Sequence, residues 1–296
     1  MNILLFGKNG QVGWELQRAL APLGNLIALD RHSQDYCGDF ENPEGIAETV
    51  RQLKPAVIVN ATAYTAVDKA ESDQQKAELI NATTVAALAK AAEEVSAWLI
   101  HYSTDYVFNG SGETAWREND ATAPLNVYGK TKLAGEEAIA RYATRYLIFR
   151  TSWVYATKGN NFAKTMIKLA QERETLSVIN DQFGAPTGAD LIADSTAHAI
   201  RTAFINPEVS GLYHLVASGT TTWHNYAEVV IEHVRGLEKE IKVQNITAVP
   251  TSAFPTPAKR PGNSRLATEK FIQTFGLNLP GWESGVKRML DELYSE

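Results

Sequence analysis

Short apolar runs alternate with amphipathic helical patterns through the first half of the chain, and this alternation is the strongest constraint on the fold. Runs that are apolar at every position are typical of strands covered on both faces of a sheet. Their regular alternation with helices indicates right-handed β-α-β units around a parallel sheet. The expected strands cover 3–6, 26–29, 56–59, 98–101 and 146–149, and the expected helices cover 11–20, 43–53, 75–95 and 128–142. The sequence therefore predicts an α/β fold with a doubly wound parallel sheet in residues 1–150.

The second half of the chain, residues 151–296, is less regular. Its expected helices cover 162–172, 191–204, 223–234 and 285–293, and its expected strands cover 176–179 and 212–215. Residues 247–262 contain four prolines, and long loops in compact proteins are usually binding segments or linkers. We predict that this half forms mainly a smaller, mixed α/β substrate domain, and that some of its later segments return to the sheet.

The composition is that of an ordinary folded protein. The 296 residues include 44% hydrophobic and 21% charged residues, which excludes wholesale disorder. Cys37 is the one cysteine, so a disulfide within the chain and a cysteine-based zinc site are excluded. The six histidines form no cluster with metal-ligand spacing. The net charge of -6 argues against nucleic acid as a partner, but it is compatible with one nucleotide in a local pocket.

Hydropathy along the chain predicts no contact with a membrane. No apolar stretch approaches the roughly 18–20 residues that a membrane helix needs. The N-terminal residues have no basic region and reach Gly7 and Lys8 at once, so they do not resemble a signal peptide. We therefore expect a cytoplasmic protein.

Three glycines follow the first expected strand and precede the first expected helix, with the spacing G-x-x-G-x-x-G. They are Gly7, Gly10 and Gly13. Glycine permits a tight turn and a close approach of the backbone to a pyrophosphate at the N-terminus of a helix. The order of strand, loop and helix favours dinucleotide binding over a purely structural turn. Gln11 and Val12, at the start of the helix, are predicted to contact the same cofactor.

An acidic residue after the second strand is the next expected feature of a dinucleotide site. Asp30 follows the run at 26–29, and its carboxylate can hold ribose hydroxyl groups, as in NAD-binding proteins. Arg31 comes next, and an arginine at this place can accept a 2′-phosphate. A solvated turn is the ordinary alternative. As a functional pair, the two residues predict the use of both NADH and NADPH.

Tyr128 and Lys132 open an expected helix and lie four residues apart, so they share one helix face. A phenol exchanges protons poorly at neutral pH unless a nearby cation lowers its pKa, and Lys132 can supply that cation. Thr104 follows the strand at 98–101, where parallel sheets bind ligands, and its hydroxyl can bond a substrate carbonyl. A surface lysine and a turn hydroxyl are the ordinary alternatives.

Taken together, the glycine loop, the Thr104 hydroxyl and the Tyr128–Lys132 pair resemble the extended short-chain dehydrogenase/reductase superfamily. Four flanking segments narrow the resemblance to the dTDP-4-dehydrorhamnose reductase family: residues 63–71, 103–110, 150–155 and 260–266. The motifs run nearly end to end and follow the order of the family. The resemblance implies a Rossmann-type domain joined to a smaller domain for a dTDP-sugar.

The reaction implied by this resemblance reduces the C4 ketone of dTDP-4-dehydro-β-L-rhamnose to dTDP-β-L-rhamnose. This is the last step in making activated rhamnose for bacterial surface polysaccharide. In the family pattern Tyr128 donates the proton, while Lys132 tunes it and binds the nicotinamide ribose. Thr104 retains a hydroxyl where most of the superfamily has serine, so we expect its role to be retained. NADPH or NADH would supply the hydride.

Other residues take their expected roles from the same resemblance. Asp39 and Phe40 resemble the adenine-flanking pair that follows the third strand in the family, and they are predicted cofactor contacts. Further predicted cofactor contacts are Ala61, Ala63, Tyr64, Thr65, Tyr128 and Lys132. Predicted substrate contacts are Thr104, Asp105, Trp153, Gln182 and Arg260. Arg260 lies on the proline-rich loop, and its guanidinium suits a pyrophosphate, although a solvated arginine is the ordinary alternative. A homodimer is expected, and because some family members bind Mg²⁺ at a carboxylate-lined dimer interface, Mg²⁺ is a candidate ion without named ligands.

Two other functions stay open at this point. Another nucleotide-sugar enzyme of the superfamily, such as an epimerase or a dehydratase, would share most of these motifs. A dehydratase needs an acidic pair after the catalytic hydroxyl, and Asp105-Tyr106 matches that pair only in part. A non-catalytic regulatory subunit, like the superfamily member related to methionine adenosyltransferase, would not need Thr104, Tyr128 and Lys132.

Overall fold

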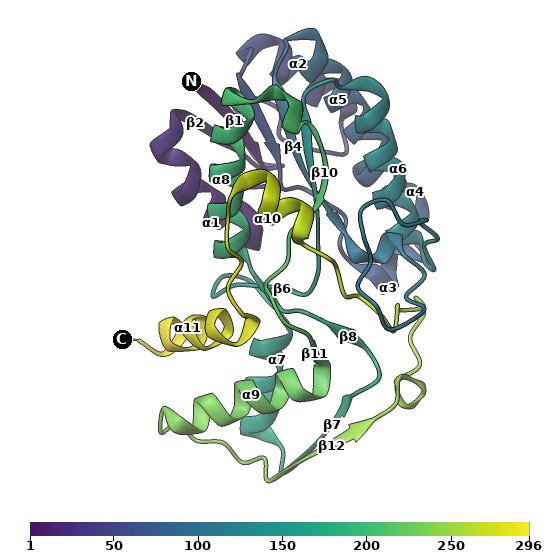
Figure 1. Ribbon diagram of the computed structural model, residues 1–296, viewed down its shortest axis with the longest axis vertical. Helices are drawn as coiled ribbons and strands as arrows, with labels where there is room; N and C mark the ends of the chain where they lie inside the picture. The colour runs from purple at the N-terminus through teal and green to yellow at the C-terminus, as the bar shows by residue number, and fades with distance from the viewer. Residues whose placement is uncertain (296) are drawn as a thin grey trace.

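A six-stranded parallel sheet forms the centre of the computed structural model, which describes residues 1–295 (Figure 1). The strands, in their spatial order, are β10 (Gly211–His214), β5 (Tyr146–Thr151), β4 (Trp98–Thr104), β3 (Val57–Asn60), β1 (Asn2–Phe6) and β2 (Asn25–Leu29). The order of the strands reverses beside β1, because β2 lies on one side of it and β3 on the other. Open parallel sheets bind ligands outside the carboxyl ends of their strands at such a point.

Helices cover both faces of the sheet, as the near-continuous burial of its strands requires. One face packs against α1 (Gln11–Leu20), α8 (Ala189–Ile205) and α10 (Glu269–Phe275). The other packs against α2 (Pro43–Leu53), α5 (Thr84–Glu94) and α6 (Val127–Tyr142). Two short helices, α3 (Val67–Ala70) and α4 (Gln74–Glu78), follow β3, and a π-helical turn, η2 (Leu79–Thr83), joins α4 to α5.

A second, smaller lobe lies below the sheet in Figure 1 and has apolar cores of its own. Its helices are α7 (Phe162–Glu172), α9 (Trp223–Gly236) and α11 (Trp282–Tyr294). Its strands pair in twos: β7 (Thr175–Ile179) with β12 (Asn245–Val249), β8 (Phe183–Gly184) with β11 (Thr221–Thr222), and β6 (Val154–Tyr155) with β9 (Thr187–Gly188). The division of the chain at residue 150 stays a prediction, and the later half supplies β10, α8 and α10 to the sheet lobe.

The predicted α/β fold is confirmed, with differences at particular elements. The strand expected at 98–101 continues to Thr104, so this hydroxyl ends the strand instead of following it. The single helix expected at 75–95 is interrupted by the π-helical turn. The loop expected at 247–262 begins inside β12, and α10 was not predicted. Within residues 1–295, no helix is both long and apolar enough to cross a membrane.

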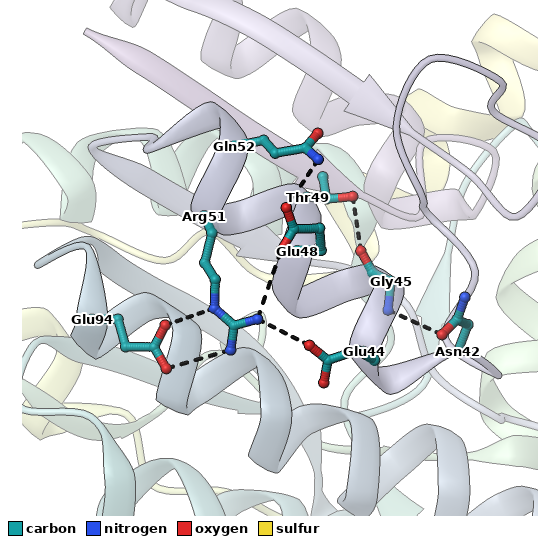
Figure 2. A network of polar contacts seen from close by, with 8 residues as sticks. All are labelled: Asn42, Glu44, Gly45, Glu48, Thr49, Arg51, Gln52 and Glu94. Carbon is teal, nitrogen blue, oxygen red and sulfur yellow. Dashed lines mark hydrogen bonds and ion pairs between the residues drawn. The ribbon is translucent and has the colours of Figure 1, made fainter.

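A surface network of polar groups fastens α2 to α5, and Figure 2 shows it. Arg51 donates from Nε to Glu94 Oε2 at 2.8 Å and from Nη1 to Glu44 Oε1 at 3.0 Å. Asn42 caps α2, because its Oδ1 accepts from the Gly45 amide at 3.0 Å. The arginine holds the pKa of Glu94 below its ordinary value. These groups are exposed to solvent, so we assign the network a structural role and only a small contribution to stability.

Candidate active site

A cleft of about 580 Å³ opens at the carboxyl ends of β1, β2 and β3. Nine of the predicted cofactor residues line it: Gly7, Gly10, Asp30, Arg31, Asp39, Phe40, Ala63, Tyr64 and Thr65. Asn9, His32, Lys69 and Lys76 also line it and were not predicted. Asn9 and His32 adjoin residues that were predicted, whereas Lys69 lies on α3 and Lys76 on α4. Neither helix was expected to reach the cofactor. The cleft thus stands where an open parallel sheet takes its ligand.

The three positions Gly7, Gly10 and Gly13 of the first loop are occupied by glycine for different physical reasons. Gly7 has a φ of +86°, and a Cβ there would lie 2.8 Å from the Ala61 carbonyl. A Cβ on Gly13 would lie 2.0 Å from the Gly7 oxygen, so packing alone requires glycine at both positions. At Gly10 the nearest atom would be an ordinary 3.5 Å away. Packing therefore does not explain Gly10, and its predicted contact with a ligand stays a prediction.

Asp30 is held as a charged acceptor on the rim of the cleft. Its Oδ1 accepts from the His32 amide at 2.8 Å, and the Lys8 ammonium lies 3.8 Å from Oδ2. Burial alone would raise the pKa of Asp30, but the His32 hydrogen bond and Lys8 outweigh it and hold the pKa below its ordinary value. The ionised carboxylate can accept bonds from ribose hydroxyls.

Six predicted cofactor residues do not line the cleft, and two of them, Tyr128 and Lys132, are described below. Val12 and Ala61 pack against the apolar core, and Gly13 closes against the Gly7 backbone. Gln11 Oε1 accepts from Asn161 Nδ2 at 3.1 Å and so joins α1 to the second half of the chain. Their contacts with a cofactor stay predictions.

Asp39 and Phe40 reach the cleft by a route that differs from the expected pattern. The resemblance places such a pair after a third strand, but between β2 and α2 the described chain has no strand. Phe40 is instead held by the apolar core, where its ring meets Phe6 edge to face at 5.4 Å between centroids. Packing against the apolar core therefore holds Phe40 at the cleft, whereas strand pairing would hold it in the expected pattern.

Thr104 lies at the carboxyl end of β4 in a set of directed hydrogen bonds. Its hydroxyl donates to Asp105 Oδ1 at 3.0 Å and accepts from the Tyr106 amide at 3.1 Å. A hydroxyl has one proton and two lone pairs, so one lone pair of Thr104 is still free to accept. Tyr128 lies within interaction distance of this hydroxyl. The structure therefore brings together the two predicted catalytic hydroxyls.

Burial raises the pKa of Tyr128 to about 12, against a lowering contribution from Thr104, and the charge of Asp105 adds to the increase. The prediction that Lys132 lowers this pKa does not hold for this arrangement. Lys132 Nζ instead donates to the Tyr102 carbonyl at 2.6 Å and lies 3.1 Å from His101 Nε2. Tyr128 is consequently protonated at neutral pH, which is the form a proton donor needs.

Helix α6, which carries Tyr128 and Lys132, is fixed at its start and at its middle. Asn126 caps it by accepting from the Gly129 amide at 2.8 Å, and its Nδ2 donates to the Lys259 carbonyl. Glu136 and Arg150 form a bidentate ion pair with distances of 2.9 and 2.6 Å, and both are buried. These contacts join the helix to β5 and to the proline-rich loop.

Three polar residues around this site were not predicted. Asn81, on the π-helical turn, accepts from the Tyr64 amide and donates to Thr131 Oγ1 on α6. Asn60 and His101 end or interrupt the apolar runs of β3 and β4 and contact each other at 3.0 Å. Polar residues inside apolar strands are a signal in the sequence that points to such contacts, because buried polar groups require partners.

Two of the predicted substrate residues are held by aromatic and amide contacts in the second lobe. Trp153 has a φ of +50° and stacks on Trp223 with 3.6 Å between ring centroids. Gln182 is buried, accepts from Trp223 Nε1 at 3.0 Å and donates to Thr251 Oγ1 at 3.1 Å. Each end of the Gln182 amide thus has one partner, which leaves one N–H donor and one oxygen lone pair for contact with a nucleotide.

Arg260, the last predicted substrate residue, is paired with an acid. Its Nη2 lies 2.6 Å and its Nη1 3.2 Å from the carboxylate oxygens of Asp68 on α3. The Ala258 amide also donates to Asp68. The proline-rich loop is therefore anchored to the sheet lobe beside the site. Among residues 1–295, no group of three or more acidic, histidine or cysteine side chains could hold a metal ion.

The chain is similar to known proteins along its described length. A family model described as the RmlD substrate binding domain matches residues 1–295. A dTDP-4-dehydrorhamnose reductase of Shigella flexneri is 70% identical over 295 residues, which cover 100% of this chain and 99% of that protein.

Two solved structures agree with this match. A dTDP-4-dehydrorhamnose reductase from Clostridium acetobutylicum superposes with a TM-score of 0.89 at 34% identity, covering 100% of both chains. One from Bacillus anthracis, in complex with NADP, has a TM-score of 0.87 at 33% identity and covers 98% of this chain and 99% of its own. The chain belongs to the dTDP-4-dehydrorhamnose reductase family.

Proposed function

We propose that this chain uses NADPH or NADH to reduce the C4 ketone of dTDP-4-dehydro-β-L-rhamnose to dTDP-β-L-rhamnose. The full-length 70% identity to a dTDP-4-dehydrorhamnose reductase supports the substrate, and the NADP in the Bacillus anthracis structure supports the cofactor. One observation carries the proposal: the cofactor cleft and the Thr104–Tyr128 pair lie at the same edge of one parallel sheet.

The residues of the cleft suit a nicotinamide dinucleotide. Gly10 leaves room at the N-terminus of α1, where backbone amides favour a pyrophosphate. The Asp30 carboxylate is ionised and can hold ribose hydroxyls, and the adjoining Arg31 can meet a 2′-phosphate. This pairing is the basis for proposing that both cofactors are used.

When bound, the nicotinamide supplies a hydride to the ketone carbon. Tyr128 gives its O–H proton to the ketone oxygen as negative charge develops there, so the product is the neutral alcohol. Thr104 positions Tyr128 and the ketone oxygen through its hydroxyl. Its own proton is bonded to Asp105, so Asp105 decides whether that proton is free for the substrate.

The second lobe and the proline-rich loop would hold the dTDP part of the substrate. Trp153 and Gln182 lie together with Trp223 in that lobe, and Arg260 lies beside the catalytic edge on Asp68. A homodimer in the cytoplasm completes the proposal. Cys37 is a free cysteine, as a reducing compartment favours.

Cofactor stoichiometry tests the proposal against the epimerase alternative. The purified protein is mixed with dTDP-4-dehydrorhamnose and either NADPH or NADH, and cofactor absorbance is followed alongside product. We expect one cofactor to be oxidised for each dTDP-rhamnose formed, with both cofactors active. Turnover without net oxidation would indicate an epimerase instead, and a thousandfold preference for one cofactor would contradict the assignment of Asp30 and Arg31.

A further inference from the structure

A chain of buried polar groups runs from the end of β3 through β4 to Lys132 on α6. Asn60 Oδ1 accepts from the Thr62 amide at 2.9 Å, and Asn60 Nδ2 lies 3.0 Å from His101 Nδ1. His101 Nε2 lies 3.1 Å from Lys132 Nζ, which also donates to the Tyr102 carbonyl at 2.6 Å. Asn60, His101 and Lys132 are all at most 2% exposed. Water therefore cannot replace a missing partner without entering the core.

The direction of these bonds determines which nitrogen of His101 carries a proton. A backbone amide can only donate, so the Thr62 amide fixes the Asn60 oxygen on its own side. The Asn60 amide nitrogen then faces His101 Nδ1 and donates to it. Nδ1 must be unprotonated to accept, so the proton of a neutral imidazole lies on Nε2. Burial lowers the pKa of His101 well below its ordinary value, which favours this neutral ring.

The His101 Nε2–H group then points at Lys132 Nζ. An ammonium group has three protons and no lone pair, so it would place donor against donor. An uncharged amine has one lone pair, which accepts from Nε2–H while an amine proton goes to the Tyr102 carbonyl. The uncharged amine thus satisfies every group in the chain, and the ammonium does not.

We propose that His101 is a positioning residue for Lys132: its Nε2–H favours the uncharged amine and holds the side chain on the Tyr102 carbonyl. The tautomer and the charge state stand on the hydrogen bonds alone. The consequence for catalysis rests on the proposed function, in which a charged Lys132 serves the cofactor and Tyr128.

Other ionisable groups near Lys132 do not replace His101 in this role. Glu136 lies on the same helix and raises the pKa of Lys132, but its carboxylate is paired with Arg150 of β5. Burial outweighs Glu136 and lowers the pKa of Lys132 to about 8. Asp105 and Tyr128 interact with each other. With a pKa near 8, both charge states of Lys132 are populated close to physiological pH, so a modest change at His101 shifts the balance between them.

Nuclear magnetic resonance of the wild-type protein provides the first test, without substrate or cofactor. With ¹⁵N-labelled histidine, the two-bond couplings of each ring show which nitrogen is protonated, and His101 is assigned by its loss in His101→Gln. We expect a neutral Nε2–H tautomer that does not titrate between pH 6 and 9. An Nδ1–H tautomer, or a charged ring, would overturn the proposal even if Asn60→Asp does not fold.

Asn60→Asp supplies the second test, because it reverses the direction of the hydrogen bonds from residue 60 to Lys132 while the side chain keeps its shape. The new carboxylate still accepts from the Thr62 amide, and its other oxygen accepts from His101 Nδ1–H. Nε2 then becomes an acceptor that favours the ammonium. We expect His101 to change tautomer and the pKa of Lys132, followed by the ¹⁵N shift of its amine, to rise by about one unit or more, a tenfold change in proton affinity.

Asn206→Asp is the matched control, because it introduces the same charge at an exposed residue near the amino end of β10. We expect it to leave the His101 tautomer and the Lys132 titration unchanged. A Lys132 titration that is the same in wild type and Asn60→Asp, or that moves equally in the control, contradicts the proposal. Neither readout uses turnover, so failure here is distinct from failure of the cofactor-stoichiometry experiment.

Discussion

At the scale of single residues, Asp105 controls the hydrogen bonds of Thr104 at the carboxyl end of β4. Its Oδ1 takes the only proton of Thr104, while its Oδ2 has no partner among the described residues. Burial raises the pKa of Asp105 to about 6, although the nearby Ser264 and Thr104 hydroxyls act to lower it. The protein therefore keeps a carboxyl group that is costly to ionise next to Tyr128, and this cost is measurable.

Asp105→Asn should change how stability depends on pH. The pKa of Asp105 is higher in the folded state than its ordinary 3.8, so its stabilising effect is complete below pH 4 and is lost as pH rises through 6. Each pKa unit corresponds to about 1.4 kcal/mol. Between pH 4 and pH 8, wild type should therefore lose roughly 2–3 kcal/mol of its free energy of unfolding relative to Asp105→Asn. Urea titrations check this, and two parallel pH curves would refute it.

At the scale of elements, α6 carries both Tyr128 and Lys132, the residues proposed to act in catalysis. The buried Glu136–Arg150 pair joins it to β5. Desolvation of two charges is costly, so such a pair adds little net stability, but removing one partner leaves a buried charge without compensation. The pair therefore fixes the position of α6 more than it strengthens the fold.

Glu136→Met should destabilise the protein far more than removal of both charges. We expect the single change to reduce the free energy of unfolding by about 3–5 kcal/mol, because the Arg150 guanidinium stays buried. The double variant Glu136→Met/Arg150→Met should cost much less, since both charges are gone. Chemical denaturation of the three variants (with Arg150→Met as the other single change) measures the coupling. Additive losses would show that the pair does not act as a unit.

The sequence predicted this helix well but not the contacts that hold it. Apolar periodicity placed α6 within one residue of its observed start. The strand before it was cut short because His101, Tyr102 and Ser103 interrupt the apolar run of β4. Ion pairs and hydrogen bonds between elements depend on packing, so periodicity does not indicate them. The hydrogen bond from the Thr62 amide to Asn60 Oδ1 and the bond from Lys132 Nζ to the Tyr102 carbonyl are examples at the candidate site.

At the scale of the whole molecule, the catalytic edge lies between the sheet lobe and the proline-rich loop. Asp68 on α3 binds Arg260, which is 192 residues away in the chain. Gly110 allows this loop to approach, since a Cβ on it would lie 2.3 Å from Pro261. No sequence pattern could indicate that Arg260 meets Asp68, because only the folded chain brings them together.

Arg260→Ala should weaken binding of the dTDP-sugar without damaging the fold. A hydrogen bond to a charged group contributes about 1.5–3 kcal/mol, so we expect KM for the dTDP-sugar to rise roughly 10- to 100-fold. The Arg260–Asp68 pair is partly exposed, so the melting temperature should change little. Asp68→Asn is the matched variant, because it loosens the loop but keeps the arginine. An unchanged KM in Arg260→Ala would remove Arg260 from the substrate site.

Tyr128→Phe tests the central claim most directly, because it removes one hydroxyl and leaves the shape of the site. Turnover of dTDP-4-dehydrorhamnose is measured together with NADPH binding, which reports on the intact cleft. We expect the affinity for NADPH to be retained and kcat to fall by about 10²- to 10⁴-fold, the usual contribution of general acid catalysis. A kcat equal to that of wild type, with the same cofactor affinity, would contradict the account of Tyr128 as the proton donor of a reductase.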